Sequence, residues 1–233
     1  MIFAIIKAAP TLDTNQILNL NQTSVIYDDK GNSMDDVITT DESNQVVKRT
    51  DVSLAQTSQY LGPAFISIED QRFRSEGGID FIGITRATLL DIKNKLFNSS
   101  SSTQGASTLT QQLIKNTLFL EDSINNRINY TRKIQEAYLA MQLNKSMSKD
   151  DILEAYMNTI FLGGNAHGVE AAAYQYFSET SEDLTLVQSA FIAGMAQSPS
   201  QLYPFSAAGE KDSDIYINRT KLVLSKMKDK IGR

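Results

Sequence analysis

The stretch Pro63-Ala64-Phe65-Ile66-Ser67-Ile68-Glu69-Asp70 joins an apolar run directly to two carboxylates. Proline is favoured in a first helical turn, and the apolar residues at 64, 65 and 68 recur at the spacing of a helix. Glu69 therefore falls at the edge of the buried stripe, where partial desolvation makes a carboxylate a better base. On its own, this pattern is more typical of an ordinary solvated helix end, so the two interpretations stay open at this point.

Helical periodicity continues well beyond this stretch. It predicts helices over 81–97, 107–119, 131–146, 149–161, 167–177 and 213–230, and an apolar helix that follows Thr185. Ser148 with Asp151, and Thr185 with Gln188, have the form of capping boxes. Residues 23–27 read as a strand, and residues 28–32 as the turn of a hairpin. The predicted fold class is mainly α, with a small β-containing N-terminal segment.

The change of texture along the chain predicts three segments. These are a polar, irregular N-terminal segment with the predicted strand over 1–60, a mainly helical segment over 61–212, and a C-terminal amphipathic helix over 213–233. The serine-rich stretch 98–106 interrupts the middle segment, and its composition is typical of a mobile loop.

Composition excludes several classes of chemistry. The 233 residues include no cysteine and one histidine, His167, which excludes disulfides, zinc–thiolate sites, thiol nucleophiles and multi-histidine metal sites. The formal net charge of -5 argues against nucleic acid as the main partner. No stretch reaches the ~20 apolar residues that a membrane-spanning helix needs.

The stretch 105–116, Gly-Ala-Ser-Thr-Leu-Thr-Gln-Gln-Leu-Ile-Lys-Asn, leads small and hydroxyl residues into a helix. A helix start presents backbone N–H groups and the positive end of the helix dipole to an anion. Ser107 would add a donor, and Lys115 a point charge for phosphate. The alternative is a capped helix with a polar face.

A second group of charges lies on one predicted helix. Arg132 and Lys133 come four and three residues before Glu136, so the three side chains share a face. The ordinary interpretation is a surface ion pair. The functional one is a carboxylate held ionised by two cations, ready to meet another charged group or a metal ion.

In order along the chain, five motifs resemble those of the peptidoglycan glycosyltransferases of glycosyltransferase family 51. This family comprises the transglycosylase domains of class A penicillin-binding proteins and the monofunctional transglycosylases. The motifs are Glu69-Asp70-x-x-Phe73 with Gly78-x-Asp80, Ser107-Thr108-x-Thr110-Gln111-Gln112-x-x-Lys115-Asn116, Arg132-Lys133-x-x-Glu136, Ile152-Leu153-Glu154-x-Tyr156-x-Asn158, and Ala193 to Pro199. The chain departs from the family's usual residues at Glu76, Ala106 and His167, where histidine, glycine and an aromatic residue are usual.

The resemblance implies a lysozyme-like helical fold and the polymerisation of lipid II into glycan strands. It makes Glu69 the base for the acceptor 4-hydroxyl, and Glu136 the residue that assists departure of the lipid diphosphate, directly or through Mg²⁺ or Mn²⁺, with Glu136 as a metal ligand. No organic cofactor is expected. The residues that it implies for substrate binding are Asp70, Phe73, Ser107, Thr108, Gln111, Gln112, Lys115, Asn116, Arg127, Arg132 and Lys133.

The resemblance also implies roles for the three segments, a location and partners. It makes 1–60 a juxtamembrane and β segment, 61–212 the glycosyltransferase catalytic domain, and 213–233 a helix or connector to a transpeptidase domain. We expect the bacterial cell membrane at its extracytoplasmic face, with an anchor preceding the present chain and a transpeptidase domain or partner in the full-length protein. The expected partners are lipid II, the nascent glycan strand and the membrane surface, with no nucleic acid. Two alternatives stay open: a lysozyme-like glycan hydrolase, and a non-catalytic lipid II-binding domain.

Overall fold

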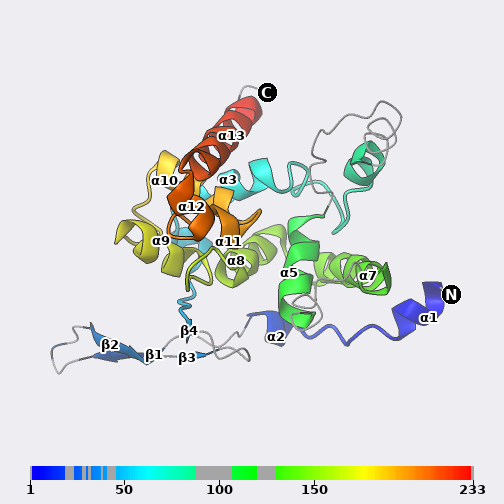
Figure 1. The fold of residues 1–233 in the computed structure, drawn as a ribbon. Helices are drawn as coiled ribbons and strands as arrows, with labels where there is room; N and C mark the ends of the chain where they lie inside the picture. The colour runs from blue at the N-terminus through cyan, green and yellow to red at the C-terminus, as the bar shows by residue number, and fades with distance from the viewer. Residues whose placement is uncertain are drawn as a thin grey trace. The chain divides into compact units, whose positions relative to one another are not determined.

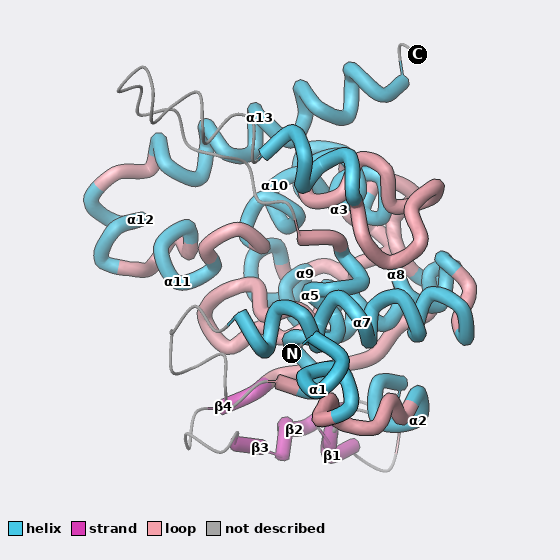
Figure 2. The backbone as a smooth tube through the Cα atoms, turned by 90° about the vertical axis from the view of Figure 1, so that its right-hand side faces the viewer, coloured by secondary structure: helices cyan, strands magenta, loops and turns pink. Residues whose placement is uncertain are grey.

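The computed structural model describes residues 2–18, 24–27, 30, 33–37, 39–40, 46–87, 107–119 and 130–231. These residues are mainly helical, and strands occur only in the N-terminal segment (Figure 2). The helices are α1 (Ile2–Lys7), α2 (Thr14–Leu18), α3 (Leu61–Ile68), α5 (Leu109–Leu118), α7 (Tyr130–Ser146), α8 (Lys149–Thr159), α9 (Val169–Phe177), α10 (Leu186–Met195), α11 (Pro199–Leu202), α12 (Ala207–Lys211) and α13 (Asp214–Ile231), with a 3-10 turn η1 (Leu54–Gln56). Residues 81–87 are also helical. The predicted mainly α fold class is confirmed.

The strands form two antiparallel pairs. β1 (Ser24–Tyr27) pairs with β2 (Ser33–Val37), and β3 (Thr39–Thr40) pairs with β4 (Val46–Val47). The strand predicted over 23–27 is present as β1, and its antiparallel pairing with β2 is that of a hairpin; of the predicted turn over 28–32, all but residue 30 lies outside the described residues. A bulge between Ile26 and Tyr27 shifts the register of the first pair.

The chain divides into two compact units that do not follow the three predicted segments. Unit 1 combines Met1–Thr14 with Glu69–Leu153, and unit 2 combines Asn15–Ile68 with Glu154–Arg233. The C-terminal helix α13 belongs to unit 2, where it packs against α3 and α10 (Figure 1). The first residues belong to unit 1, where α1 packs against α7. Each unit therefore combines helices that are far apart in the sequence and pack against one another.

The core of unit 2 is built around α3. Every residue of this helix except Pro63 is buried, as expected for a helix that is apolar on all sides. The ring of Phe65 meets Tyr156 edge to face, with centroids 5.6 Å apart. α3 ends at Ile68, and Glu69 is the first residue of the segment that follows.

Glu154 and Asn158 on α8 hold the chain that precedes α3 in unit 2. The Glu154 carboxylate accepts the Leu54 N–H at 2.7 Å. The Asn158 side chain accepts the Val52 N–H at 3.1 Å and donates to the Val52 carbonyl at 2.9 Å. The fourth sequence motif therefore satisfies backbone groups of an irregular segment.

Local signals at the other helix starts and at His167 are also resolved. Both predicted capping boxes form, with reciprocal hydrogen bonds between Ser148 and Asp151 and between Thr185 and Gln188. The His167 ring lies 4.9 Å from that of Phe161, and its backbone N–H donates to Lys48. The His167 ring thus packs against Phe161, at the position where the family usually has an aromatic residue.

Several predictions fall where the structure describes little or nothing. The loop 98–106, with Ala106, lies outside the described residues, as does Arg127, and the helix predicted over 81–97 is described only to residue 87. Among the helices that are described, none is long and apolar enough to cross a membrane.

Gly78 closes the segment 69–80 of unit 1 against α7 in a way that only glycine allows. Its φ is +95°, and a Cβ atom at this position would overlap the backbone carbonyl of Ala140. Its own carbonyl accepts a hydrogen bond from the Thr108 hydroxyl at 2.8 Å. The segment that begins with Glu69 is therefore fastened by backbone contact to α7 and to the start of α5.

We expect Gly78→Ala to destabilise the protein because it combines an unfavourable backbone conformation, worth about 1–3 kcal/mol, with a backbone clash. Thermal unfolding followed by circular dichroism measures the effect. Gly77→Ala is the matched control, since a Cβ atom there meets nothing within 4 Å. Equal melting temperatures for the two variants would contradict this account of Gly78.

Candidate functional site

Glu69 is the first residue after α3, and its half-buried carboxylate is held from α5. The Gln112 side-chain amide donates to Glu69 Oε2 at 3.0 Å. A hydrogen bond from an amide orients the carboxylate without neutralising it, so the group can still accept a proton. The structure thus brings together two residues that the sequence assigned to different motifs.

Asp70, the neighbour of Glu69, is 5% exposed and accepts the Leu109 N–H at 3.1 Å. Leu109 is the first residue of α5, so this carboxylate lies at the positive end of the helix dipole. Burial raises the pKa of Asp70 to about 6, and the negative charges of Glu76 and Asp80 raise it as well. The Leu109 N–H and the charge of Lys149 act in the opposite direction.

The start of α5 is closed by its own capping box. The Thr108 hydroxyl accepts the Gln111 N–H at 3.1 Å, and the Gln111 side-chain oxygen accepts the Thr108 N–H at 3.0 Å. Together with Asp70, these contacts occupy the N–H groups of Leu109 and Gln111. The anion predicted at this helix start is therefore met by the protein's own carboxylate, and these two N–H groups are not open to a phosphate.

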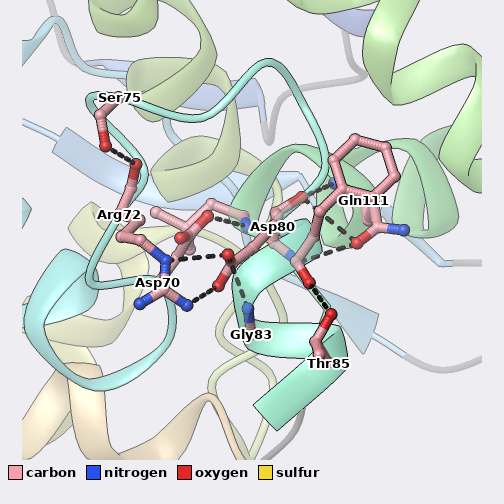
Figure 3. A network of polar contacts seen from close by, with 10 residues as sticks. Asp70, Arg72, Ser75, Asp80, Gly83, Thr85 and Gln111 are labelled. Atoms are coloured by element: carbon pink, nitrogen blue, oxygen red, sulfur yellow. Dashed lines mark hydrogen bonds and ion pairs between the residues drawn. The ribbon is translucent and has the colours of Figure 1, made fainter. Parts of the chain in front are cut away.

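Figure 3 shows a second carboxylate that orders the same segment. Asp80 forms an ion pair with Arg72, whose Nε lies 2.8 Å from Asp80 Oδ1, and it accepts the Gly83 N–H at 2.8 Å. Burial would raise the pKa of Asp80, but its bonds to Arg72 and Gly83 outweigh burial and lower it. Asp80 thus stays ionised and caps the helical residues 81–87.

Glu136 is fully buried on α7 between two cations. Lys133 Nζ lies 2.7 Å from Glu136 Oε2, and Arg132 Nε lies 3.0 Å from Glu136 Oε1 as an ion pair outside hydrogen-bond geometry. A buried carboxylate needs such pairing because desolvation penalises its charge. The predicted arrangement of a carboxylate flanked by cations is present, with the carboxylate fully buried, Arg132 10% exposed and Lys133 44% exposed.

Lys115 brings a third cation to Glu136 from α5, which packs against α7. Burial lowers the pKa of Lys115, the nearby Lys133 and Arg132 lower it too, and Glu136 opposes them. Arg132 and Lys133 pair with Glu136, and Lys115 interacts electrostatically with all three, so the group carries an excess of positive charge. Such an excess suits a dianionic or diphosphate ligand.

One face of α5 connects the two glutamates. Gln112 and Lys115 are three residues apart and therefore lie on the same side of this helix. The first contacts Glu69, and the second belongs to the group around Glu136. One face of α5 thus carries a residue that interacts with each of the two predicted catalytic glutamates.

The geometry around Glu136 does not fit a metal site built by the protein. Mg²⁺ and Mn²⁺ prefer several oxygen ligands, whereas the neighbours of this carboxylate are cations. Within the described ranges, no group of three or more histidine, aspartate or glutamate side chains is arranged to hold a metal ion.

The remaining predicted site residues differ in exposure. Phe73 is fully buried, and Thr108 and Gln111 are buried in the capping box, so their placement favours a role in building the site. Ser107, Gln112, Lys115 and Asn116 are half-buried. Sequence reasoning missed the contact of Lys149 with Glu76 at 2.8 Å, because no local pattern links residues 73 positions apart.

The chain is similar to known proteins over nearly its whole length. The model of the transglycosylase family matches residues 35–228. Penicillin-binding protein 1A of Clostridium acetobutylicum is 56% identical over 98% of the chain, and that of Clostridium botulinum is 50% identical over the same share. A match to the crystal structure of penicillin-binding protein 1A from Haemophilus influenzae covers 92% of the present chain and 19% of the Haemophilus chain, with 23% sequence identity and a TM-score of 0.44.

The chain spans about a quarter of the length of these curated relatives, 27% and 26% respectively. Within that quarter the agreement is continuous, since the family model covers most of the residues described above. The chain therefore belongs to the transglycosylase family, the enzymes that act as peptidoglycan glycosyltransferases.

Proposed function

We propose that this chain polymerises lipid II, transferring the growing glycan from its lipid diphosphate to the 4-hydroxyl of an acceptor sugar. The observation that carries the proposal is the arrangement along α5. Gln112 orients the half-buried Glu69, and one turn away Lys115 joins the cation group around the buried Glu136. A base and a positively charged site on one helix face are what this transfer requires.

In the proposed reaction, Glu69 removes the proton from the acceptor hydroxyl. The oxygen attacks the anomeric carbon of the donor from the side opposite to the diphosphate, so the configuration inverts. The bond from the anomeric carbon to the diphosphate oxygen breaks, and the bonding electrons leave with the diphosphate. Lys115, Arg132 and Lys133 stabilise this negative charge, and Glu136 holds the last two in place.

An exposed apolar surface in unit 1 supports the proposal that the substrate is linked to a lipid. Phe81 and Ile82 are each 67% exposed in the helical residues 81–87, and Ile84 is also exposed. Apolar side chains on an exposed helix favour contact with the interface of a bilayer. We propose that the whole protein acts at the extracytoplasmic face of the bacterial membrane, where a transpeptidase region would act on the glycan product.

We expect Glu69→Gln to lower the rate of polymerisation by on the order of 10²–10⁴-fold, because the amide cannot take the hydroxyl proton. The measurement is gel analysis of products from lipid II in detergent. Glu182→Gln, which changes an exposed carboxylate of unit 2, is the matched control and should keep full activity. Undiminished polymerisation by Glu69→Gln would refute the assignment of the base.

The same assay distinguishes the proposed synthase from a hydrolase when intact glycan strands are supplied in parallel. Polymer from lipid II, without cleavage of the strands, supports the proposal. Release of muropeptides without polymer would establish a lysozyme-like hydrolase in its place. Binding of lipid II by the wild type with neither product would identify a non-catalytic module.

We expect Lys115→Met to lower the polymerisation rate by on the order of 10²-fold, since it removes one cation that stabilises the departing charge. Inhibition by inorganic diphosphate should weaken in parallel. Lys145→Met, at the exposed end of α7, is the control and should change neither quantity. Unaltered diphosphate inhibition in Lys115→Met would remove Lys115 from the proposed anion site.

A further inference from the structure

Two ion pairs join the segment 69–80 to the first turn of α8, all within unit 1. Glu76 pairs with Lys149 at 2.8 Å, with side chains 5% and 18% exposed. Arg74 pairs with Asp150, with side chains 50% and 65% exposed. Exposed pairs contribute little, whereas the removal of one partner from a buried pair leaves an uncompensated charge. Loss of one partner should therefore matter for the pair of Glu76 and Lys149, whereas the exposed pair of Arg74 and Asp150 serves as a control.

Lys149 makes more than a single contact. Its ammonium lies 4.5 Å from the centroid of the buried Phe73 ring, a cation–π arrangement. It also acts electrostatically on Asp70. The other oxygen of Glu76, Oε2, is buried without a hydrogen-bond partner. Lys149 therefore compensates charge in a region where buried negative charge would otherwise accumulate.

Asp70 is the group on which these charges converge. The charges of Glu76, Asp80 and Arg72, in the same segment, act on it electrostatically. The charge of Lys149 acts on it from α8, and the Leu109 N–H of α5 donates a hydrogen bond to it. Glu76 favours its protonated form, and Lys149 favours its ionised form. The partners of one ion pair thus have opposite effects on the same buried carboxyl.

We propose that Lys149, which pairs with Glu76 and packs on Phe73, is a positioning residue that keeps Asp70 ionised at the start of α5 against the opposing charge of Glu76, and thereby holds Gln112 against Glu69. The activity readouts of this proposal rest on the proposed function. An ionised carboxylate is the stronger acceptor for the Leu109 N–H, and it also interacts favourably with the helix dipole. Gln112 lies one turn further along the same helix, so the position of the helix start governs its reach to Glu69.

The test exploits the opposite signs. In selectively ¹³C-labelled protein, the carboxyl resonance of Asp70, assigned with Asp70→Asn, is followed through a pH titration. We expect Lys149→Met to move its midpoint to higher pH and Glu76→Gln to move it to lower pH, each by about half a unit or more. Lys149→Arg should restore the wild-type midpoint.

Activity provides the second readout. The acid limb of kcat/KM for lipid II polymerisation should move in the same two directions in these variants. Arg74→Gln and Asp150→Asn are the controls and should leave both the titration and the acid limb in place. Thermal unfolding of each variant shows that the comparison is made on folded protein.

The outcomes separate this proposal from the proposed function. Opposite shifts of the Asp70 resonance support the coupling even if the wild type makes no polymer, and in that case the proposed function is what fails. Shifts of equal sign, as loss of a merely structural ion pair would give, overturn the coupling. So does an unchanged midpoint in both variants.

Discussion

The hydrogen bond from the Leu109 N–H to the buried carboxylate of Asp70 is the contact on which the arrangement of unit 1 depends. It joins the residue after Glu69 to the first residue of α5, across 39 positions of the sequence. Gln112 follows one turn later on the same helix, and its amide donates to Glu69. Gly78 secures the segment at a second point, where it approaches α7 too closely for any side chain.

Charge is distributed differently at the two ends of the α5 face that carries Gln112 and Lys115. Around Asp70 negative groups accumulate, and Lys149 and the Leu109 N–H counter them. Around Glu136 positive groups accumulate, and one fully buried carboxylate holds them together. A helix start that is already occupied by a carboxylate repels a further anion, whereas the cation group attracts one. The difference directs the proposed diphosphate to Lys115, Arg132 and Lys133 and leaves Glu69 for the proton.

Sequence patterns predicted much of the fold because they report local energetics. The capping boxes at Ser148 and Thr185 formed as predicted, since their hydrogen bonds span only three residues. At the start of α5 the sequence left a capped helix and an anion site open, because the local pattern cannot show that the distant Asp70 carboxylate accepts the Leu109 N–H there. The same limit hid the contact between Glu76 and Lys149. The predicted domain boundaries also differ from the compact units, which depend on packing between helices far apart in the chain.

The sequence by itself determined the mainly α class, the capped helix starts, the ordered motifs and the family to which they belong. These properties follow from periodicity, capping and residue identity, which act over a few residues. Only the tertiary structure decided that Asp70 caps α5, that Gln112 orients Glu69, and that Lys115 joins the cations around Glu136. Burial makes the difference, because it places distant charges within a few ångströms of one another and removes the water that would otherwise screen them.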